Sequence, residues 1–328
     1  MIRRKLLAGA AAGLVLPLTF PTSVFAQANN KVARLIVPFP AGGGTDAVAR
    51  MTAEKMRPEY PAGLIVENRA GASGRLGAEY VQASEADGMT LLFTPDFVMT
   101  IFPYSFKKLS YAPQQDFAPV ALCSKTGYAL VAGPGLPASV TNLQQFVAWA
   151  KANPKQAAFA STSAGSASHF GGIMLSRAIG AELLHVPYKG GALALQDVMG
   201  GQVPISINPI GEVLPHMKTG RVRVLATTGA QRSRFMPDAP TLVEAGLKDM
   251  VVESWLGVLA PGKTPAATIA KTSATINAVL QRQDIKDGYA GIGMETVQST
   301  PASFAAVIKA DMERWAPIVK ASGFTAEE

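Results

Sequence analysis

The segment Leu35-Ile-Val-Pro-Phe-Pro-Ala-Gly-Gly-Gly-Thr-Asp-Ala-Val-Ala-Arg50 sets the organisation that we expect for the rest of the chain. Its apolar start predicts a buried strand that the two prolines prevent from continuing, and the pattern after Asp46 has helical spacing. The three glycines allow positive φ and close approach to the main chain, and the first-turn N–H groups of the helix lack intrahelical partners. Such a corner suits a carboxylate or a phosphate. A turn that binds nothing is the alternative.

Length and composition place the chain among well-packed globular proteins. Its 328 residues exceed the usual size of one core, so we expect two domains. An apolar content of 48% with 16% charged residues excludes a disordered or fibrous protein. The net charge of +7 is modest, the basic residues are scattered and no nucleic-acid-binding signature is present, so we expect no DNA or RNA partner. A mild positive field favours small anions.

Residues 1–28 have the three parts of a secretory signal peptide. They are the basic Arg3-Arg4-Lys5, the apolar Leu6–Phe20 and small residues that end at Ala26 or Ala28. The apolar part is short for a membrane span, and the paired arginines leave both the general secretory and the twin-arginine export routes open. Cys123 is the only cysteine, which excludes an intrachain disulfide. We expect an exported protein, located in the periplasm of a two-membrane bacterium.

Predicted strands and helices alternate along the chain, which is typical of parallel α/β architecture. The pattern restarts after Lys125-Thr-Gly127, so a strand at 120–123 and another at 128–132 are expected to be separate. A strand at 157–160 opens into Ser161-Thr-Ser-Ala-Gly-Ser-Ala-Ser-His169, a second corner of small residues before a helix. Two anion-friendly corners in separate domains predict a cleft site between them. A plain helix cap is the alternative for the second corner.

Two nucleotide-binding patterns occur in the chain, and we reject both. Gly42–Ala47 fits the dinucleotide fingerprint with Glu67 in the acidic position, but Pro40 stiffens the turn and an exported protein rarely meets nicotinamide cofactors. Gly257–Thr264 matches the P-loop pattern, yet its middle is typical of a strand interior and Pro265 removes an N–H at the helix start. We therefore expect no cofactor.

An exported serine hydrolase acting on a small ester is the enzymatic alternative, because Ser163, Ser166 and Ser168 crowd His169. Its nucleophile would be Ser166 or Ser168. Such catalysis needs a base oriented by a third group, and neither a G-x-S-x-G elbow nor an acidic residue in that position stands out. The three histidines are too far apart in sequence to form a local metal set, so we expect no metal site.

Seven further segments carry a resemblance as an ordered set: Val37–Asp46, Glu67–Gly74, Gln115–Pro119, Ser163–His169, Val186–Gly191, Pro240–Gly246 and Ala260–Pro265. In this order they closely resemble the substrate-binding receptors of tripartite tricarboxylate transporters, also called the Bug family. Each segment alone is weak, but together they cover nearly the whole mature chain. The last segment also explains the P-loop match, because the family has a similar Ala-Pro-x-x-Thr-Pro turn.

The resemblance implies the α/β, two-domain type II periplasmic binding protein fold, with two mostly parallel sheets flanked by helices around a central cleft. Domain one would comprise residues 29–125 plus 222–328, and domain two residues 126–221. Such receptors are not enzymes: they close like a Venus flytrap on a small carboxylate, which can be a di- or tricarboxylate, an acidic amino acid or an aromatic acid. They present it to membrane permease subunits. We expect a monomer.

The resemblance also assigns ligand-binding positions. The Ala41–Asp46 loop would take one carboxylate, and Ser163–His169 would meet the other end of the ligand. Tyr188–Gly191 would line the cleft. The alternative for Tyr188 is that it is a core aromatic residue. Asn208 stands where such receptors often have an acidic residue, and Asp96 is an unusual polar side chain near the expected cleft mouth. The full expected set is Phe39, Ala41, Gly42, Gly43, Gly44, Thr45, Asp46, Asp96, Ser163, Ser166, Ser168, His169, Tyr188, Gly191 and Asn208.

Overall fold

The computed structural model describes residues 31–326, so the predicted signal peptide lies outside the described residues. The strands are β1 (Ala33–Val37), β2 (Leu64–Asn68), β3 (Thr90–Pro95), β4 (Phe117–Ala132), β5 (Ala158–Ser161), β6 (Leu184–Pro187), β7 (Ile205–Pro209), β8 (Arg223–Thr227), β9 (Glu253–Pro261) and β10 (Glu295–Thr296). In the part that the structure describes, no helix is long and apolar enough to cross a membrane.

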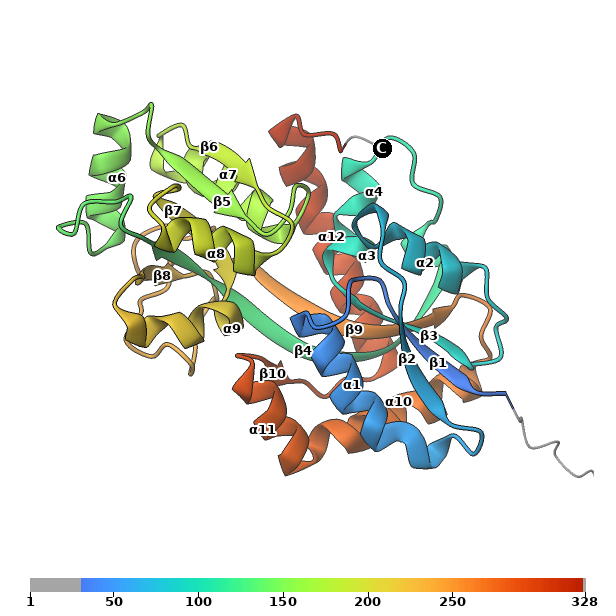
Figure 1. Cartoon of the computed structure of the whole chain (residues 1–328). Helices are drawn as coiled ribbons and strands as arrows, with labels where there is room; N and C mark the ends of the chain where they lie inside the picture. The colour runs from blue at the N-terminus through green and yellow to red at the C-terminus, as the bar shows by residue number, and fades with distance from the viewer. Residues whose placement is uncertain (1–30, 327–328) are drawn as a thin grey trace, which may run out of the picture.

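Helices cover the strands on both sides (Figure 1). They are α1 (Gly44–Met56), α2 (Arg75–Gln82), α3 (Phe97–Thr100), α4 (Phe102–Ser105), α5 (Pro113–Asp116), α6 (Leu143–Ala152), α7 (Ala167–Ile179), α8 (Gly191–Met199), α9 (Ile210–Val213), α10 (Ala266–Gln281), α11 (Gln283–Gly291) and α12 (Pro301–Ser322). Short 3₁₀ turns follow α1, precede α2 and follow α9.

The strands form one continuous path, β2-β1-β3-β9-β4-β7-β5-β6, that is shared by two lobes. In the first lobe β1 pairs in parallel with β2 and β3, and in the second β5 pairs in parallel with β6 and β7. The antiparallel strands β4 and β9 join these two parallel sets (Figure 1). The predicted two-lobe α/β architecture with flanking helices is therefore confirmed, but the sheet is mixed and continuous rather than two mostly parallel sheets, because β4 and β9 pair antiparallel with their neighbours in passing between the lobes.

β4 is a single strand of 16 residues, where the sequence predicted two separate strands. The prediction of two strands was wrong because Lys125-Thr126-Gly127, which are polar or lack a side chain, interrupt the apolar pattern but not the strand. In the structure they pair with Trp255, Ser254 and Glu253 of β9, so their backbone groups stay hydrogen-bonded while they pass between the two lobes. Their polar character reflects that place between the cores.

Each lobe has its own apolar core. Leu35, Val37 and Val258 belong to a core cluster of the first lobe, and Leu130 and Phe159 belong to one of the second. Burial of such side chains contributes about 1.5–3 kcal/mol each. Each lobe therefore has apolar packing of its own on either side of the strands that join them.

β8 packs with the second lobe. It pairs with the Ala129–Ala132 end of β4, and Leu225, Ala226 and Val252 belong to the core cluster that contains Phe159. The sequence analysis placed residues 222–328 in domain one. From this packing we propose that the chain returns to the first lobe at β9, beyond residue 252, so that 222–252 belong with domain two.

α12 runs along both lobes and leads into a tail that contacts each of them. The helix starts at a capping box formed by Thr300 and Ser303, and its Trp315 ring lies 6.2 Å from Phe170 of α7. After the helix, Phe324 packs against His169 of the second lobe, and the N–H of Ala326 donates to the Ser105 carbonyl of the first lobe at 2.7 Å. The tail therefore connects α4 to the β5–α7 corner.

Candidate functional site

The first corner is the turn between β1 and α1. Ala41 to Gly44 are exposed and Thr45 is half-buried. Gly42 has φ +88°, a conformation that favours glycine, whereas Gly43 has φ −78° and precedes the helix as its N-cap. A β-carbon on Gly43 would approach only the Pro40 carbonyl, at 3.9 Å. The turn is therefore exposed and uncrowded at Gly43, and the first-turn N–H groups of α1 have no intrahelical partners, as an anion site requires.

Asp46 is buried beneath this turn and holds it in shape. Its carboxylate accepts hydrogen bonds from the Gly42 N–H at 2.9 Å, from Arg50 Nε at 3.0 Å and from Asn68 Nδ2 at 2.8 Å. Burial raises the pKa of Asp46, but the hydrogen bonds from Arg50, Gly42 and Asn68 outweigh it and keep the pKa below its usual value. The carboxylate is thus charged, fully engaged and unsuited to meeting an anionic ligand.

The second corner is the turn between β5 and α7. Ser166 is the N-cap of α7 and its Oγ accepts from the His169 N–H at 3.3 Å. Ser168 Oγ accepts from the Thr162 N–H at 3.0 Å and lies 2.9 Å from Ser166 Oγ. Ser163 and Thr162 are partly exposed, whereas Ser166 and Ser168 are buried. The buried hydroxyls therefore shape the turn, and Ser163 and Thr162 form its accessible surface.

His169 and His185 are stacked behind this corner, with ring centroids 3.8 Å apart. His169 Nδ1 accepts from the Gly165 N–H at 3.1 Å, and His185 Nε2 lies 2.7 Å from Ser161 Oγ. Burial, followed by the charge of His185, lowers the pKa of His169 to about 3, and burial lowers that of His185 to about 4. Both rings are neutral at neutral pH.

This geometry offers little to the serine hydrolase alternative. The imidazole ring of His169 has no hydrogen bond to the side chain of Ser166 or Ser168 among the described residues, and its Nδ1 accepts a backbone N–H, where a triad histidine donates to a carboxylate. A ring with a pKa of about 3 is also a weak base at neutral pH. Residues 31–326 contain no group of three potential metal ligands.

The β6–α8 turn and the end of β7 adjoin the second corner. Tyr188 is half-buried, and its hydroxyl donates to Asp197 at 2.6 Å while its N–H donates to the Ser161 carbonyl at 3.1 Å. Asn208 is fully buried, and its Nδ2 donates to the Gly191 carbonyl at 2.9 Å. A β-carbon on Gly191 would lie 2.4 Å from that Nδ2 and even closer to Glu212, so only glycine fits here. Sequence reasoning missed Glu212, because a lone glutamate on a short helix has no distinguishing pattern.

Two sets of contacts bring the corners of the two lobes together. On one side the Phe39 ring lies 5.9 Å from Phe97, which in turn packs against the second-lobe cluster that contains Phe170. On the other side the segment 292–294 passes between Gly44 and Gly211, where a β-carbon on Gly211 would lie 1.9 Å from the Ile292 carbonyl oxygen. Phe97 was not predicted, because an aromatic residue in an apolar run looks like any core residue.

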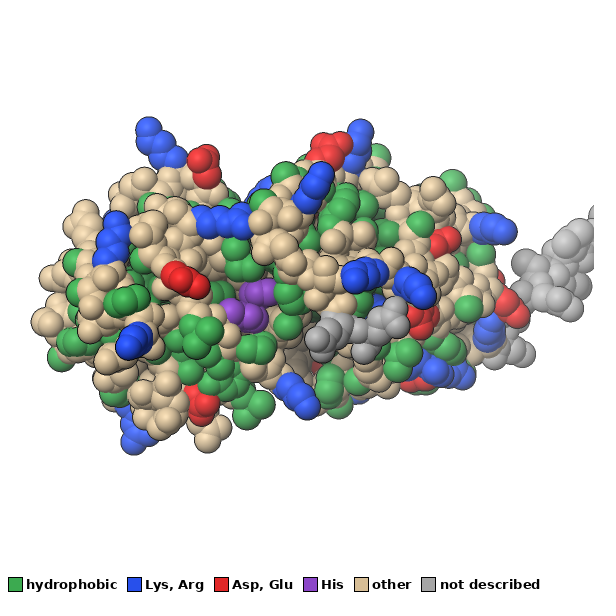
Figure 2. Space-filling model, turned by 90° about the horizontal axis from the view of Figure 1, so that it is seen from above, with side chains coloured by type: hydrophobic (Ala, Val, Ile, Leu, Met, Phe, Trp, Pro, Cys, Tyr) green, Lys and Arg blue, Asp and Glu red, His purple; other side chains and the backbone are tan. Residues whose placement is uncertain are grey.

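The surface is hollowed between the lobes, and histidine side chains are visible at the bottom of the hollow (Figure 2). Asp96, expected near the mouth of the cleft, is instead completely buried between β3 and β9. The expected residues thus fall into two groups. The partly or fully exposed ones are Phe39, Ala41, Gly42, Gly43, Gly44, Thr45, Ser163 and Tyr188, and the buried ones are Asp46, Asp96, Ser166, Ser168, His169, Gly191 and Asn208.

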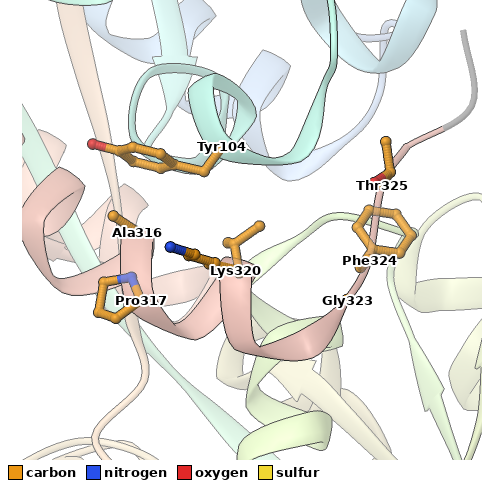
Figure 3. A pocket seen from close by; sticks show the side chains of 8 residues that line it. Tyr104, Ala316, Pro317, Lys320, Gly323, Phe324 and Thr325 are labelled. Atoms are coloured by element: carbon orange, nitrogen blue, oxygen red, sulfur yellow. The ribbon is translucent and has the colours of Figure 1, made fainter.

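Two further hollows lie outside the corners. One, of about 480 Å³, lies between Tyr104 of α4 and the end of α12 with the tail, and Lys320 and Phe324 line it (Figure 3). The other, of about 350 Å³, lies where β4 and β9 cross between the lobes and includes Lys125 and Arg234. Neither is lined by a residue of the two corners.

A family model described as "Tripartite tricarboxylate transporter family receptor" matches residues 48–324 of the chain. The chain belongs to this receptor family. The resemblance in the seven segments is thereby confirmed. Among curated relatives, protein BugT of Bordetella pertussis is 32% identical over 315 residues, covering 96% of this chain and 94% of BugT.

Solved structures of receptors agree with the fold. The periplasmic binding protein BugD is 31% identical with a TM-score of 0.79, covering 90% of this chain and 98% of BugD. MatC from Rhodopseudomonas palustris, determined with bound malate, is 29% identical with a TM-score of 0.78, covering 88% of this chain and 98% of MatC. A protein of R. palustris determined with adipate is 30% identical with a TM-score of 0.81, covering 90% and 98%. The two-domain periplasmic binding protein fold is confirmed.

Proposed function

We propose that this protein is a periplasmic receptor that captures a small organic carboxylate between its two lobes and presents it to the membrane subunits of a tripartite tricarboxylate-type transporter. The observation that carries the proposal is the pair of helix-start corners, one in each lobe, at Gly42–Thr45 and at Thr162–Ser166. Phe39, which precedes the first corner, packs against Phe97, and Gly165 of the second corner lies against Phe324. No catalytic step is proposed.

The chemistry of the corners favours a carboxylate. The starts of α1 and α7 each supply unpaired backbone N–H groups and the positive end of a helix dipole. The accessible side chains, Thr45 and Ser163, add small hydroxyl groups. The bound malate and adipate of the two R. palustris receptors support the same ligand class. Periplasmic location and permease partnership are inferred from the family.

The direct test is a thermal-shift panel on the purified mature protein with malate, adipate, aspartate, citrate and benzoate. A ligand present at 100 times its dissociation constant adds about 2.7 kcal/mol to the free energy of unfolding, so a true ligand gives a clear, saturating rise in Tm. Sodium chloride at matched ionic strength is the control for non-specific salt effects. Isothermal titration calorimetry then measures the affinity. A flat response to every carboxylate, together with turnover of an ester substrate, would overturn the receptor assignment.

A further inference from the structure

A buried carboxyl group lies where the two lobes join. Asp96 follows β3 and is 0% exposed. Its Oδ1 accepts a hydrogen bond from Ser254 Oγ at 2.5 Å, and its Oδ2 is buried without a hydrogen-bond partner among the described residues. No lysine or arginine therefore neutralises it by direct contact. An ionised carboxylate with one oxygen unpaired in such surroundings is costly, whereas the protonated form is not.

The contact joins a first-lobe strand to the strands that cross between the lobes. Ser254 belongs to β9 and pairs with Thr126 of β4, at the junction of the two lobes. The Asp96 N–H donates to the Trp255 carbonyl at 3.0 Å. The next residue, Phe97, packs against Phe39, which precedes the first corner. Asp96 thus ties the end of β3 to β9, one of the two strands that cross between the lobes and that we call the hinge strands.

Two elements near Asp96, β4 and α12, supply the ionisable groups that face it. Tyr128 of β4 is buried, and burial followed by the charge of Asp96 raises its pKa. Asp311 of α12 accepts from Trp255 Nε1 at 2.7 Å and lies near the charges of Arg314 and Lys125. Burial raises the pKa of Asp96 to about 7, the Ser254 hydrogen bond opposes this, and the charge of Asp311 adds to it.

We propose that Asp96 is a positioning residue of the hinge, holding a proton while the lobes are arranged as seen here and losing it when they separate, so that closure on a ligand takes up one proton. Separation moves the second-lobe residue Tyr128 and admits water to Oδ2, which stabilises the charged form. The proton comes from solvent and forms the carboxyl O–H bond on closure. This inference rests on the proposed receptor function.

Linkage fixes the direction of the effect. Asp96 has a lower pKa in the open form than in the closed form, so the closed form binds one more proton at pH values between the two. As pH rises through that range, carboxylate affinity falls by up to tenfold per pH unit, and it levels off above the closed-form pKa. For the closed form that upper limit is about pH 7. Affinity should therefore fall from about pH 6 to about pH 7 and stay constant up to about pH 8.5, a range in which dicarboxylate probes remain ionised.

The experiment is calorimetric titration of the mature protein with malate, and in parallel adipate, across that range in buffers of different ionisation enthalpy. The wild type should take up close to one proton per ligand near pH 6. Asp96→Asn should bind with no proton uptake and a flat pH profile. Asp311→Asn, which removes the neighbouring carboxyl group, should retain proton uptake. Ser254→Ala removes the hydrogen bond that lowers the Asp96 pKa. In this variant the affinity should still fall as pH rises, but the pH at which it levels off should be higher than in the wild type.

The outcomes separate the two proposals. Wild-type binding without proton uptake, or proton uptake that persists in Asp96→Asn, overturns the hinge assignment and leaves the receptor function standing. If Asp311→Asn loses proton uptake and Asp96→Asn keeps it, the proton binds to Asp311, and the hinge proposal is overturned. If no carboxylate binds at any pH, the receptor function fails and the hinge proposal fails with it.

Discussion

The carboxylate of Asp46 and the backbone N–H of Gly42 are joined by a hydrogen bond of 2.9 Å across the turn that precedes α1. Arg50 and Asn68 bind the same carboxylate, and Asn68 also donates to the Phe39 carbonyl at 3.1 Å. A residue that the sequence suggested as a ligand contact therefore acts on the turn from beneath. The first-turn N–H groups of α1 have no intrahelical partner and remain for a ligand.

Replacing Asp46 with alanine should weaken carboxylate binding at least tenfold. The substitution removes the acceptor of the Gly42 N–H and of one Asn68 amide N–H. Each lost hydrogen bond should cost about 0.5–1.5 kcal/mol of stability, and the turn becomes free to change shape. Glu54→Ala, on the exposed side of the same helix, is the matched control and should change neither property. Calorimetric titration and chemical denaturation measure the two effects. Unchanged affinity in Asp46→Ala would show that the turn keeps its shape without the carboxylate.

Gly43→Leu should abolish carboxylate binding and leave the fold intact. The backbone of Gly43 is in a region open to every residue and its β-carbon position is free of clashes, so the leucine side chain projects into the space in front of the first turn of α1. Gly42→Ala is the contrasting variant: φ +88° costs a non-glycine residue about 1–2 kcal/mol, so stability should fall. Thermal melts with and without ligand distinguish the two. A Gly43→Leu protein that binds normally would remove the first corner from the site.

Local patterns in the sequence were enough to place both corners. An apolar run followed by Gly42-Gly43-Gly44 gave β1 and the start of α1, and the small residues before His169 gave β5 and the start of α7. These features depend on neighbours within a few residues, for which glycine, proline and capping preferences carry direct information. The anion-binding role that we propose for the corners rests on the same local geometry.

Contacts between distant parts of the chain could not be predicted in this way. Asp96 and Ser254 are far apart in sequence, and nothing near either residue indicates the other. The same is true of Phe324 and His169, and of the pairing with β9 that keeps β4 continuous. Whether a polar side chain meets ligand or is buried depends on these long-range contacts, which is why Asp96 was expected near the cleft mouth.

Ser166→Ala should reduce both stability and ligand affinity, because Ser166 caps α7 inside the second corner. Loss of an N-cap hydroxyl typically costs about 1 kcal/mol. Thr300→Ala is a matched control: Thr300 caps α12 in the same manner, by accepting from the Ser303 N–H at 3.0 Å, but it lies away from the corners. Both variants should lose similar stability in denaturant titrations, and only Ser166→Ala should lose affinity. Equal affinities would mean that the second corner is only a helix cap.

The stacked pair of His169 and His185 should make the protein less stable in acid. Because burial lowers the pKa of His169 to about 3, from about 6.5 in the unfolded chain, the unfolded state binds more protons below about pH 6.5 and the free energy of unfolding falls as pH falls through that value. Burial lowers the pKa of His185 to about 4, so this histidine also reduces the stability as pH falls.

Asp96 acts oppositely, since its raised pKa makes the folded state bind more protons between about pH 4 and about pH 7, and stability from that group falls as pH rises. The wild-type profile sums these opposing slopes, so the informative quantity is the difference between a variant and the wild type at each pH. When the pH is lowered from 7 to 5, the free energy of unfolding of His169→Gln should rise by about 2 kcal/mol relative to that of the wild type. The wild type loses this stability because its His169 binds a proton in the unfolded chain but not in the folded protein, and the variant lacks that imidazole. Urea denaturation at both pH values measures it. A difference that stays constant with pH would mean that His169 is protonated as readily in the folded protein as in the unfolded chain.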